Sequence, residues 1–225
     1  MTESRLAPPT AVVLDMDGTL VDTVPTRIDA WLRTFADEGI PADRALVTAL
    51  IGSDGRQLAI QVGEAAGVHI DDQRSERIDA RSGAIYSELN AHPRVLPGVT
   101  AFLDALDAAN IRWTIGTSSR REQVGPSVAA LQRSTPPLIV DGTTVKLAKP
   151  HPDLLLAAAR LLDTDPAACW CVGDSRWDML AAAAAGMPAV GITAGSAVTA
   201  DQLHDAGASL VLPRLAELIP YLGEG

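Results

Sequence analysis

Lysine is almost absent from this sequence of 225 residues, which contains only Lys146 and Lys149. Arginine supplies the remaining basic side chains, and an excess of Asp and Glu gives a net charge of −10 at pH 7. Nucleic acids and anionic membrane surfaces are bound through basic faces, so this charge argues against both as partners. A genome rich in Arg and Ala explains the scarcity of lysine, yet the same scarcity favours a chemical role for a lysine that remains.

The sequence also lacks long apolar runs and is poor in cysteine. No run approaches the roughly 20 apolar residues that cross a membrane, and residues 1–9 lack the apolar segment of a signal peptide, so we expect a cytoplasmic protein. Cys169 and Cys171 stand two apart in an apolar run, a spacing that does not suit an ordinary disulfide within one strand. A metal site would need more ligands, and we expect both cysteines to be small buried residues.

Short apolar runs alternate with helical patterns along most of the chain. The runs span residues 12–14, 111–116, 138–140, 169–173, 189–192 and 210–212. They are continuously apolar, as in parallel strands that are covered on both faces. Apolar residues at helical spacing lie between them, so the pattern from residue 95 onward predicts a doubly wound α/β sheet.

Residues 22–92 interrupt this alternation with helical patterns alone. Four helices are expected, around residues 28–35, 45–50, 58–66 and 78–89. We therefore predict a core domain of residues 1–20 and 96–225 and a helical cap domain of residues 21–95, with linkers near 19–24 and 91–98. An insert that is tethered twice beside the active-site edge is suited to act as a lid.

The most informative polar residues follow the first expected strand, in Asp15-Met16-Asp17-Gly18-Thr19. Ligands of doubly wound sheets bind at the carboxyl ends of the strands. There one carboxylate can attack a substrate while the other moves a proton, and Gly18 lets the chain turn sharply away from the strand.

Other strand ends are expected to bring matching groups to the same rim. Thr117 and Ser118 follow the strand from residue 111, and Asp174 follows the strand from residue 169, with Asp178 one helical turn later. Lys149 lies in the loop after residues 138–140. A nucleophile candidate, hydroxyl and amide donors, one cation and a second acidic pair together indicate a phosphoryl-transfer centre.

With these motifs in order, the sequence resembles the haloacid dehalogenase superfamily of aspartyl-phosphate enzymes. The segment Asp15–Thr19 is similar to the first motif of that superfamily and Thr117 to the second. Lys149-Pro150 and the segment 173–178 are similar to the third and fourth. The resemblance covers nearly the whole chain, and the helical insert resembles the C1 cap of phosphoglycolate-phosphatase-like and β-phosphoglucomutase-like members.

The resemblance implies roles for the acidic residues. Asp15 would attack phosphorus and form an aspartyl-phosphate, while Asp17 would protonate the leaving group and then deprotonate water. Mg²⁺ would be held by the Asp15 carboxylate, the Asp17 backbone carbonyl and Asp174. Asp178 would orient Lys149 or the water shell of the metal.

The same resemblance implies how the phosphoryl group is held. Thr117 and the backbone amides of Ser118 and Gly18 would bind its oxygens, and Lys149 would neutralise developing charge. Arg56, in a glycine-rich turn between two cap helices, would bind a second anionic group on the substrate, with a solvated arginine as the open alternative. His151 is expected to be a loop residue.

Absent residues separate the members of the superfamily. Dehalogenases proper lack the second aspartate of the first motif, so Asp17 argues against them. Phosphonoacetaldehyde hydrolases need a cap lysine, and residues 20–95 contain none. β-Phosphoglucomutases use a cap lysine too, and they carry a histidine where our alignment places Arg27.

The sequence therefore predicts a Mg²⁺-dependent phosphatase that hydrolyses a small-molecule phosphate monoester. A phosphosugar mutase with the same aspartyl-phosphate chemistry is the alternative. A non-enzymatic phosphate-sensing protein is a third reading, disfavoured by the length of the chain, the helical insert and Asp17. Either a monomer or a homodimer is compatible with the sequence.

Overall fold

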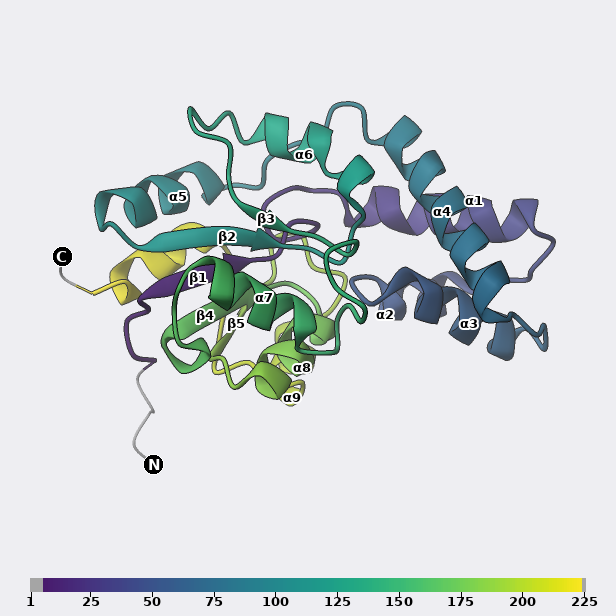
Figure 1. Cartoon of the computed structure of the whole chain (residues 1–225). Helices are drawn as coiled ribbons and strands as arrows, with labels where there is room; N and C mark the ends of the chain where they lie inside the picture. Colours follow the sequence, from purple (N-terminus) through teal and green to yellow (C-terminus); the bar gives the residue numbers. More distant parts are fainter. Residues whose placement is uncertain (1–5, 224–225) are drawn as a thin grey trace.

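A computed structural model describes residues 6–223 and places a six-stranded parallel sheet at the centre of the fold (Figure 1). The strand order is β3-β2-β1-β4-β5-β6, and every neighbouring pair is parallel. The strands are β1 (Ala11–Leu14), β2 (Arg112–Gly116), β3 (Ile139–Val140), β4 (Cys169–Gly173), β5 (Ala189–Ile192) and β6 (Leu210–Leu212). All six runs expected to be strands are confirmed, with ends that differ by no more than one residue.

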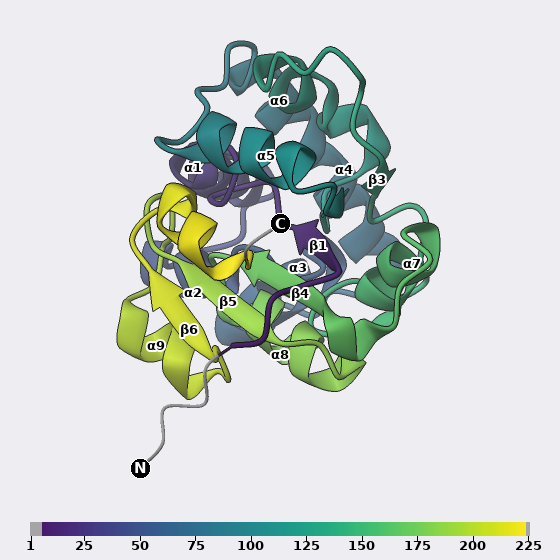
Figure 2. The same cartoon turned by 90° about the vertical axis from the view of Figure 1, so that its left-hand side faces the viewer.

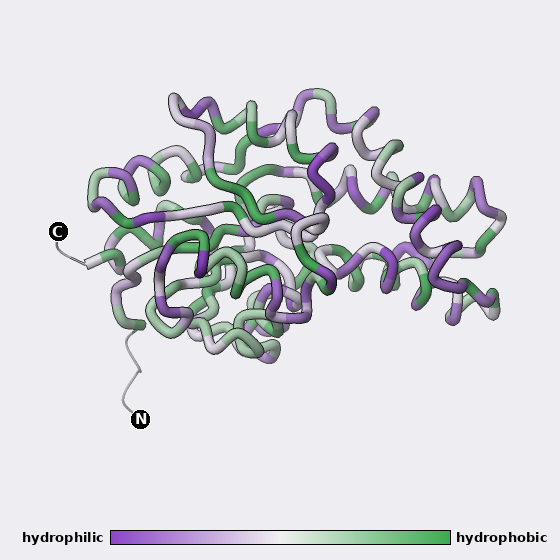
Figure 3. The backbone as a smooth tube through the Cα atoms, in the orientation of Figure 1, coloured by the Kyte–Doolittle hydropathy of each residue, from purple (hydrophilic) through white to green (hydrophobic). Residues whose placement is uncertain are grey.

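Helices cover both faces of the sheet (Figure 2). One face packs against α5 (Val99–Ala108), α6 (Gly125–Ala130) and the 3₁₀ helix η3 (Leu215–Tyr221), and the other against α7 (Asp153–Leu161), α8 (Arg176–Ala185) and α9 (Ala200–Asp205). Alternate residues of β1 serve opposite faces: Val12 and Leu14 join the first cluster, while Ala11 and Val13 join the second. In Figure 3 the tube through the central strands is coloured largely as hydrophobic. The all-parallel sheet with helices on both faces confirms the expected doubly wound α/β fold.

The shortest helices were not expected from the sequence. α6 and α9 contain six residues each, and η1 (Arg121–Gln123) and η2 (Pro166–Ala168) contain three. Segments of this length hold too few apolar positions to show a helical period.

Residues 24–89 form a helical insert that projects beyond the carboxyl ends of the strands (Figure 1). It consists of α1 (Val24–Asp37), α2 (Arg44–Leu50), α3 (Gly55–Ala65) and α4 (Asp72–Leu89). Trp31 and Phe35 stack at 5.5 Å between ring centroids within a separate hydrophobic cluster of the insert. Its two connecting segments lie side by side, because Asp22 N–H donates to the Arg94 carbonyl oxygen (2.8 Å).

The insert packs against the carboxyl edge of the sheet. Trp177, at the start of α8, is buried in the hydrophobic cluster of the insert. The Ser118 hydroxyl donates to the Gly52 carbonyl oxygen (3.3 Å), and the Asp54 N–H donates to the Lys149 carbonyl oxygen (3.0 Å). The insert therefore covers the rim at which ligands of this fold class bind.

Among residues 6–223, no helix combines the length and the hydrophobicity that a membrane span requires.

Candidate active site

The carboxyl end of the sheet brings Asp15 and Lys149 together. Asp15 directly follows β1, and its N–H donates to the Val172 carbonyl oxygen (2.8 Å). Lys149 comes from the loop between β3 and α7 and is 1% exposed. Its Nζ lies 2.5 Å from Asp15 Oδ1 and donates to the Gly116 carbonyl oxygen at 2.9 Å. One of the two lysines of the chain is therefore a buried counter-charge to this carboxylate.

Two further carboxylates join Asp15 in an acidic cluster. Asp174 follows β4 and Asp178 lies in the first turn of α8, and one oxygen of each lies within 4.8 Å of the others and of an Asp15 oxygen. Asp178 Oδ1 is 2.6 Å from Lys149 Nζ. Asp178 Oδ2 accepts from the Ser175 N–H (3.0 Å) and hydroxyl (2.6 Å). The first of these bonds, together with the donation from the Asp178 N–H to the Ser175 hydroxyl oxygen (3.3 Å), forms the capping box of α8. Three carboxylates thus face one ammonium group.

This surplus of negative charge shifts the pKa values of the cluster. Burial raises the pKa of Asp15 to about 7, with Lys149 opposing the rise and Asp178 adding to it. Burial and the nearby Asp15 raise the pKa of Asp174 well above its usual range. Burial would lower the pKa of Lys149, but Asp15 and Asp178 raise it above its ordinary value. The donor set fits a hard divalent cation, because such ions prefer carboxylate oxygens and would balance the excess charge.

Four donors outside this cluster hold the Asp17 carboxylate. Oδ1 accepts from the hydroxyls of Thr23 (2.5 Å) and Tyr86 (2.9 Å). Oδ2 accepts from the Ser119 hydroxyl (2.8 Å) and the Arg27 guanidinium (3.0 Å). Burial alone would raise the pKa of Asp17, but Arg27, Thr23 and Ser119 together lower it below its ordinary value. Arg27 and Tyr86 belong to the insert, so the insert fixes the orientation of a carboxylate of the core.

Arg27 is engaged on every side in this network. Its Nη1 donates to Gln123 Oε1 (2.7 Å), and its Nη2 donates to the Ser119 hydroxyl (2.6 Å) as well as to Asp17. The guanidinium carbon lies 3.3 Å from the centroid of the Tyr86 ring. The position aligned with the mutase histidine is therefore occupied here by the ion-pair partner of Asp17.

Gly18 shapes the turn after the two aspartates. Its φ is +88°, a conformation that favours glycine, and a Cβ at this position would lie 2.3 Å from Asp174 Oδ2. Its N–H donates to the Val21 carbonyl oxygen (2.8 Å). The turn itself thus already uses the amide that we expect to bind a phosphoryl oxygen, and that role stays a prediction. Gly18 also leaves room for the Asp174 carboxylate in the site.

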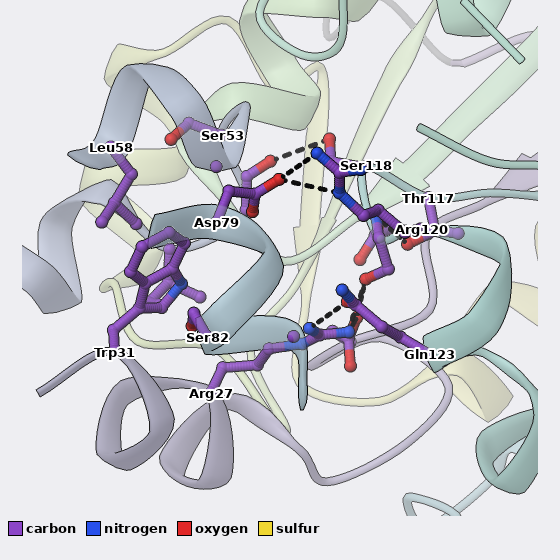
Figure 4. A pocket seen from close by; sticks show the side chains of 17 residues that line it. Arg27, Trp31, Ser53, Leu58, Asp79, Ser82, Thr117, Ser118, Arg120 and Gln123 are labelled. Carbon is purple, nitrogen blue, oxygen red and sulfur yellow. Dashed lines mark hydrogen bonds and ion pairs between the residues drawn. The ribbon is translucent and has the colours of Figure 1, made fainter. Parts of the chain in front are cut away.

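A cavity of about 60 Å³ lies between the carboxyl ends of the strands and the insert (Figure 4). Asp15 and Asp17 line it, together with Thr117 and Ser118 from the loop after β2. Thr117 is 1% exposed, and its hydroxyl accepts from the Ser119 N–H (3.1 Å). A free volume of this size holds a few water molecules.

Arg56 does not line this cavity. Its Nη2 lies 3.0 Å from Asp54 Oδ2 and donates to the Lys146 carbonyl oxygen (3.2 Å), and its side chain is 41% exposed. The N-cap residue of α3, Asp54, thus engages its guanidinium, and a contact between Arg56 and the substrate stays a prediction. His151 is an exposed loop residue, in line with the sequence.

Several polar side chains of the site were not singled out from the sequence. They are Thr19, which donates to Asp174, and Thr23, Asp79, Tyr86, Ser119, Arg120 and Gln123. A signal existed for three of them, because Thr19 and Thr23 stand in or beside the first motif and Ser119 follows Ser118. No local signal marks Asp79 and Tyr86, which reach the site only through the packing of α4.

Comparison with known proteins agrees with this geometry. A family model described as haloacid dehalogenase-like hydrolase matches residues 9–186. A phosphoglycolate phosphatase encoded on a plasmid of Cupriavidus necator is 36% identical over 189 residues, which cover 80% of this chain and 79% of the relative. The chain belongs to the haloacid dehalogenase-like hydrolase family.

Two further similarities extend over most of the chain. A β-phosphoglucomutase of Bacillus subtilis is 29% identical, with 92% of this chain and 91% of the relative covered. The solved structure of a hydrolase from Pseudomonas syringae superposes with a TM-score of 0.89 at 31% identity and covers 94% of this chain and 97% of that one. The predictions of the family, of a doubly wound α/β fold with a helical insert and of a phosphatase are confirmed.

Proposed function

We propose that the protein hydrolyses a small phosphate monoester through an aspartyl-phosphate formed on Asp15. The observation that carries the proposal is that two carboxylates, Asp15 and Asp17, line one cavity, and that Asp15 is paired with the buried Lys149. The phosphatases among the relatives support the same reaction class.

In the first half-reaction Asp15 attacks phosphorus, and the bond from phosphorus to the leaving-group oxygen breaks as that oxygen takes a proton from the protonated form of Asp17. This form is the minor one in the free protein, because Arg27, Thr23 and Ser119 lower the pKa of Asp17. In the second half-reaction Asp17 takes a proton from water, whose oxygen attacks phosphorus and frees phosphate and Asp15. Lys149 offsets negative charge on Asp15 and on the transferring group, while Thr117 and the Ser118 amide hold phosphoryl oxygens.

The carboxylates of Asp15 and Asp174 and the backbone carbonyl of Asp17 would hold Mg²⁺. When bound, Mg²⁺ shields negative charge on the carboxylates and on the phosphoryl oxygens. Asp178 positions Lys149, because Asp178 Oδ1 lies 2.6 Å from Lys149 Nζ.

The helical insert acts as a lid over the reacting groups. Its own hydrophobic cluster and the paired connecting segments support a division into a core domain of residues 1–20 and 96–225 and a cap domain of residues 21–95. A lid of this kind excludes bulk water during the transfer. We place the protein in the cytoplasm, as a monomer or homodimer acting on a small metabolite.

The test is metal-dependent release of phosphate from p-nitrophenyl phosphate and from a panel of small phosphate monoesters. We expect hydrolysis with Mg²⁺, its loss in EDTA and its return when Mg²⁺ is added back. Protein quenched in acid during turnover should carry a phosphoryl group on the peptide that contains Asp15. If the whole panel gave no metal-dependent turnover, the phosphate-sensing alternative would replace the enzyme.

Asp174→Asn should weaken the metal site without removing the nucleophile. Loss of one anionic oxygen ligand is expected to raise the Mg²⁺ concentration for half-maximal activity at least about tenfold. The measurement is a Mg²⁺ titration of p-nitrophenyl phosphate hydrolysis, with the exposed Asp104→Asn of α5 as the control. An unchanged titration would remove Asp174 from the ligand set.

Arg27→Ala should lower kcat about 10-fold to 100-fold with little change in KM, because Asp17 loses its ion-pair partner and its fixed orientation. The control is Arg33→Ala, an exposed arginine on the same helix. Steady-state kinetics with p-nitrophenyl phosphate and Mg²⁺ measure both constants. A change in KM alone would show that Arg27 binds substrate and does not position Asp17.

The β-phosphoglucomutase among the relatives keeps the mutase as the second candidate. If the protein is a mutase, it should interconvert sugar phosphates once a sugar bisphosphate has phosphorylated the enzyme. We expect release of inorganic phosphate to dominate, because the insert contains no lysine and Arg27 is committed to Asp17.

A further inference from the structure

An ion pair links the core to the insert within the cavity wall. Arg120, in the loop after β2, and Asp79, in α4, both line the cavity and point toward each other (Figure 4). Arg120 Nε donates to Asp79 Oδ2 (2.9 Å), and Nη2 lies 2.8 Å from the same oxygen. Arg120 Nη2 also lies 2.6 Å from Glu76 Oε1. Two carboxylates of α4 therefore cover one guanidinium.

The charges of this part of the wall do not favour a second anion. Two carboxylates against one guanidinium leave a charge of −1, and the neighbouring pair of Arg56 with Asp54 adds one charge of each sign. Arg27, the other arginine of the lining, is engaged by Asp17. A substrate carboxylate would therefore have to displace Asp79 from Arg120.

The wall is shaped to receive Asp79. A Cβ on Gly55, at the start of α3, would lie 2.0 Å from Asp79 Oδ1, so a larger residue there would displace the carboxylate from its present position. The Asp79 side chain is 17% exposed. Burial raises the pKa of Asp79, Arg120 opposes that rise, and two donors from one guanidinium to one oxygen favour the carboxylate form.

We infer that Asp79 makes the cavity select phosphate monoesters with an uncharged, hydroxyl-bearing leaving group, such as polyol or sugar phosphates, over those whose leaving group carries a carboxylate. The inference rests on the proposed phosphatase function. A substrate hydroxyl can donate to Asp79 and accept from Arg120 at once, and the hydroxyls of Ser53 and Ser82 line the same cavity. This reverses the expectation of a second anionic group at Arg56.

The test compares two substrates of equal carbon count, glycerol 3-phosphate and 3-phosphoglycerate, which differ in a hydroxymethyl group against a carboxylate. The wild-type enzyme should favour glycerol 3-phosphate in kcat/KM by tenfold or more. Asp79→Asn keeps the shape of the side chain and removes its charge. This variant should shift the ratio of the two kcat/KM values toward 3-phosphoglycerate by about 10-fold to 100-fold, which is the size expected for one charge-assisted hydrogen bond.

A double variant distinguishes two causes of a gain on 3-phosphoglycerate: loss of the Asp79 charge, and a weakened link between the insert and the core. Asp79→Asn combined with Arg120→Gln should lose the gain on 3-phosphoglycerate, because the exposed cation is gone. If the gain came from a weakened link between insert and core, the double variant would keep it, and the inference would be overturned. Gly55→Ala, which pushes on Asp79 from α3, should move the ratio in the same direction as Asp79→Asn.

The matched control is Asp37→Asn, which removes an exposed carboxylate of the insert that pairs with Arg81. It should leave the ratio unchanged. A wild-type enzyme that prefers 3-phosphoglycerate, or a ratio that Asp79→Asn does not move, overturns the inference. Metal-dependent hydrolysis of p-nitrophenyl phosphate, run in parallel, reports on the proposed function by itself, so the two failures are distinguishable.

Discussion

Replacement of Asp15 by asparagine is expected to reduce turnover about 10⁴-fold or more, with no phosphoenzyme detectable after an acid quench. The amide has nearly the shape of the carboxylate, but its oxygen is a poor nucleophile toward phosphorus. Loss of a nucleophile removes the covalent route as a whole, which is why such effects are large and do not add to those of neighbouring groups. Hydrolysis of p-nitrophenyl phosphate at saturating Mg²⁺ measures the loss.

The stability of this variant separates chemistry from folding. Burial raises the pKa of Asp15 from 3.8 in the unfolded chain to about 7, so ionised Asp15 destabilises the metal-free fold. Its contribution to stability is present below pH 4 and is lost as the pH rises toward 7. Metal-free Asp15→Asn should therefore unfold at pH 7 to 8 at a temperature no lower than wild type. A large drop in that temperature would mean that lost stability, and not lost chemistry, explains the low turnover. Activity near that of Asp104→Asn would contradict the assignment of Asp15 as the nucleophile.

The fold was accessible from the sequence because its signals are strong and local. Val12 to Leu14 and the other buried strands are apolar without interruption, and helical spacing between them dictates parallel pairing. The location of the polar residues that follow the strands can then be predicted from the topology of the sheet. Asp15 and Asp174 directly follow β1 and β4, and Lys149 lies in the loop after β3, so parallel pairing brings these three residues from distant parts of the chain to one edge of the sheet.

The side chains that the insert contributes to the cavity could not be predicted from the sequence in the same way. Arg56 occupies a turn that suits substrate contact, but its guanidinium is taken by Asp54, two residues away. Asp79 and Tyr86 lie one helical repeat of seven residues apart on α4, and only the docking of that helix turns them toward the core. Tertiary packing thus decides which cap residues reach the cavity, and the sequence pattern contains no measure of that docking.

Asp17→Asn is expected to lower steady-state turnover about 10²-fold to 10⁴-fold, the range for loss of a general acid and base. The effect should differ between the two half-reactions. p-Nitrophenolate leaves without protonation, so the first transfer to Asp15 should proceed with this substrate. Hydrolysis of the aspartyl-phosphate should be slow, because asparagine cannot take the proton from water. A burst of p-nitrophenol equal to the enzyme concentration should therefore precede slow turnover.

Rapid-quench kinetics make Asp15→Asn and Asp17→Asn opposite controls for each other, since the first should give no burst and the second a burst with accumulated phosphoenzyme. The four hydrogen-bond partners of Asp17 hold its carboxylate in place without serving as proton carriers. Loss of any one partner should therefore act through Asp17 and, with p-nitrophenyl phosphate, slow hydrolysis of the aspartyl-phosphate more than its formation. If Asp17→Asn instead slowed both half-reactions by similar factors, Asp17 would be a positioning residue, and another group would have to move the proton.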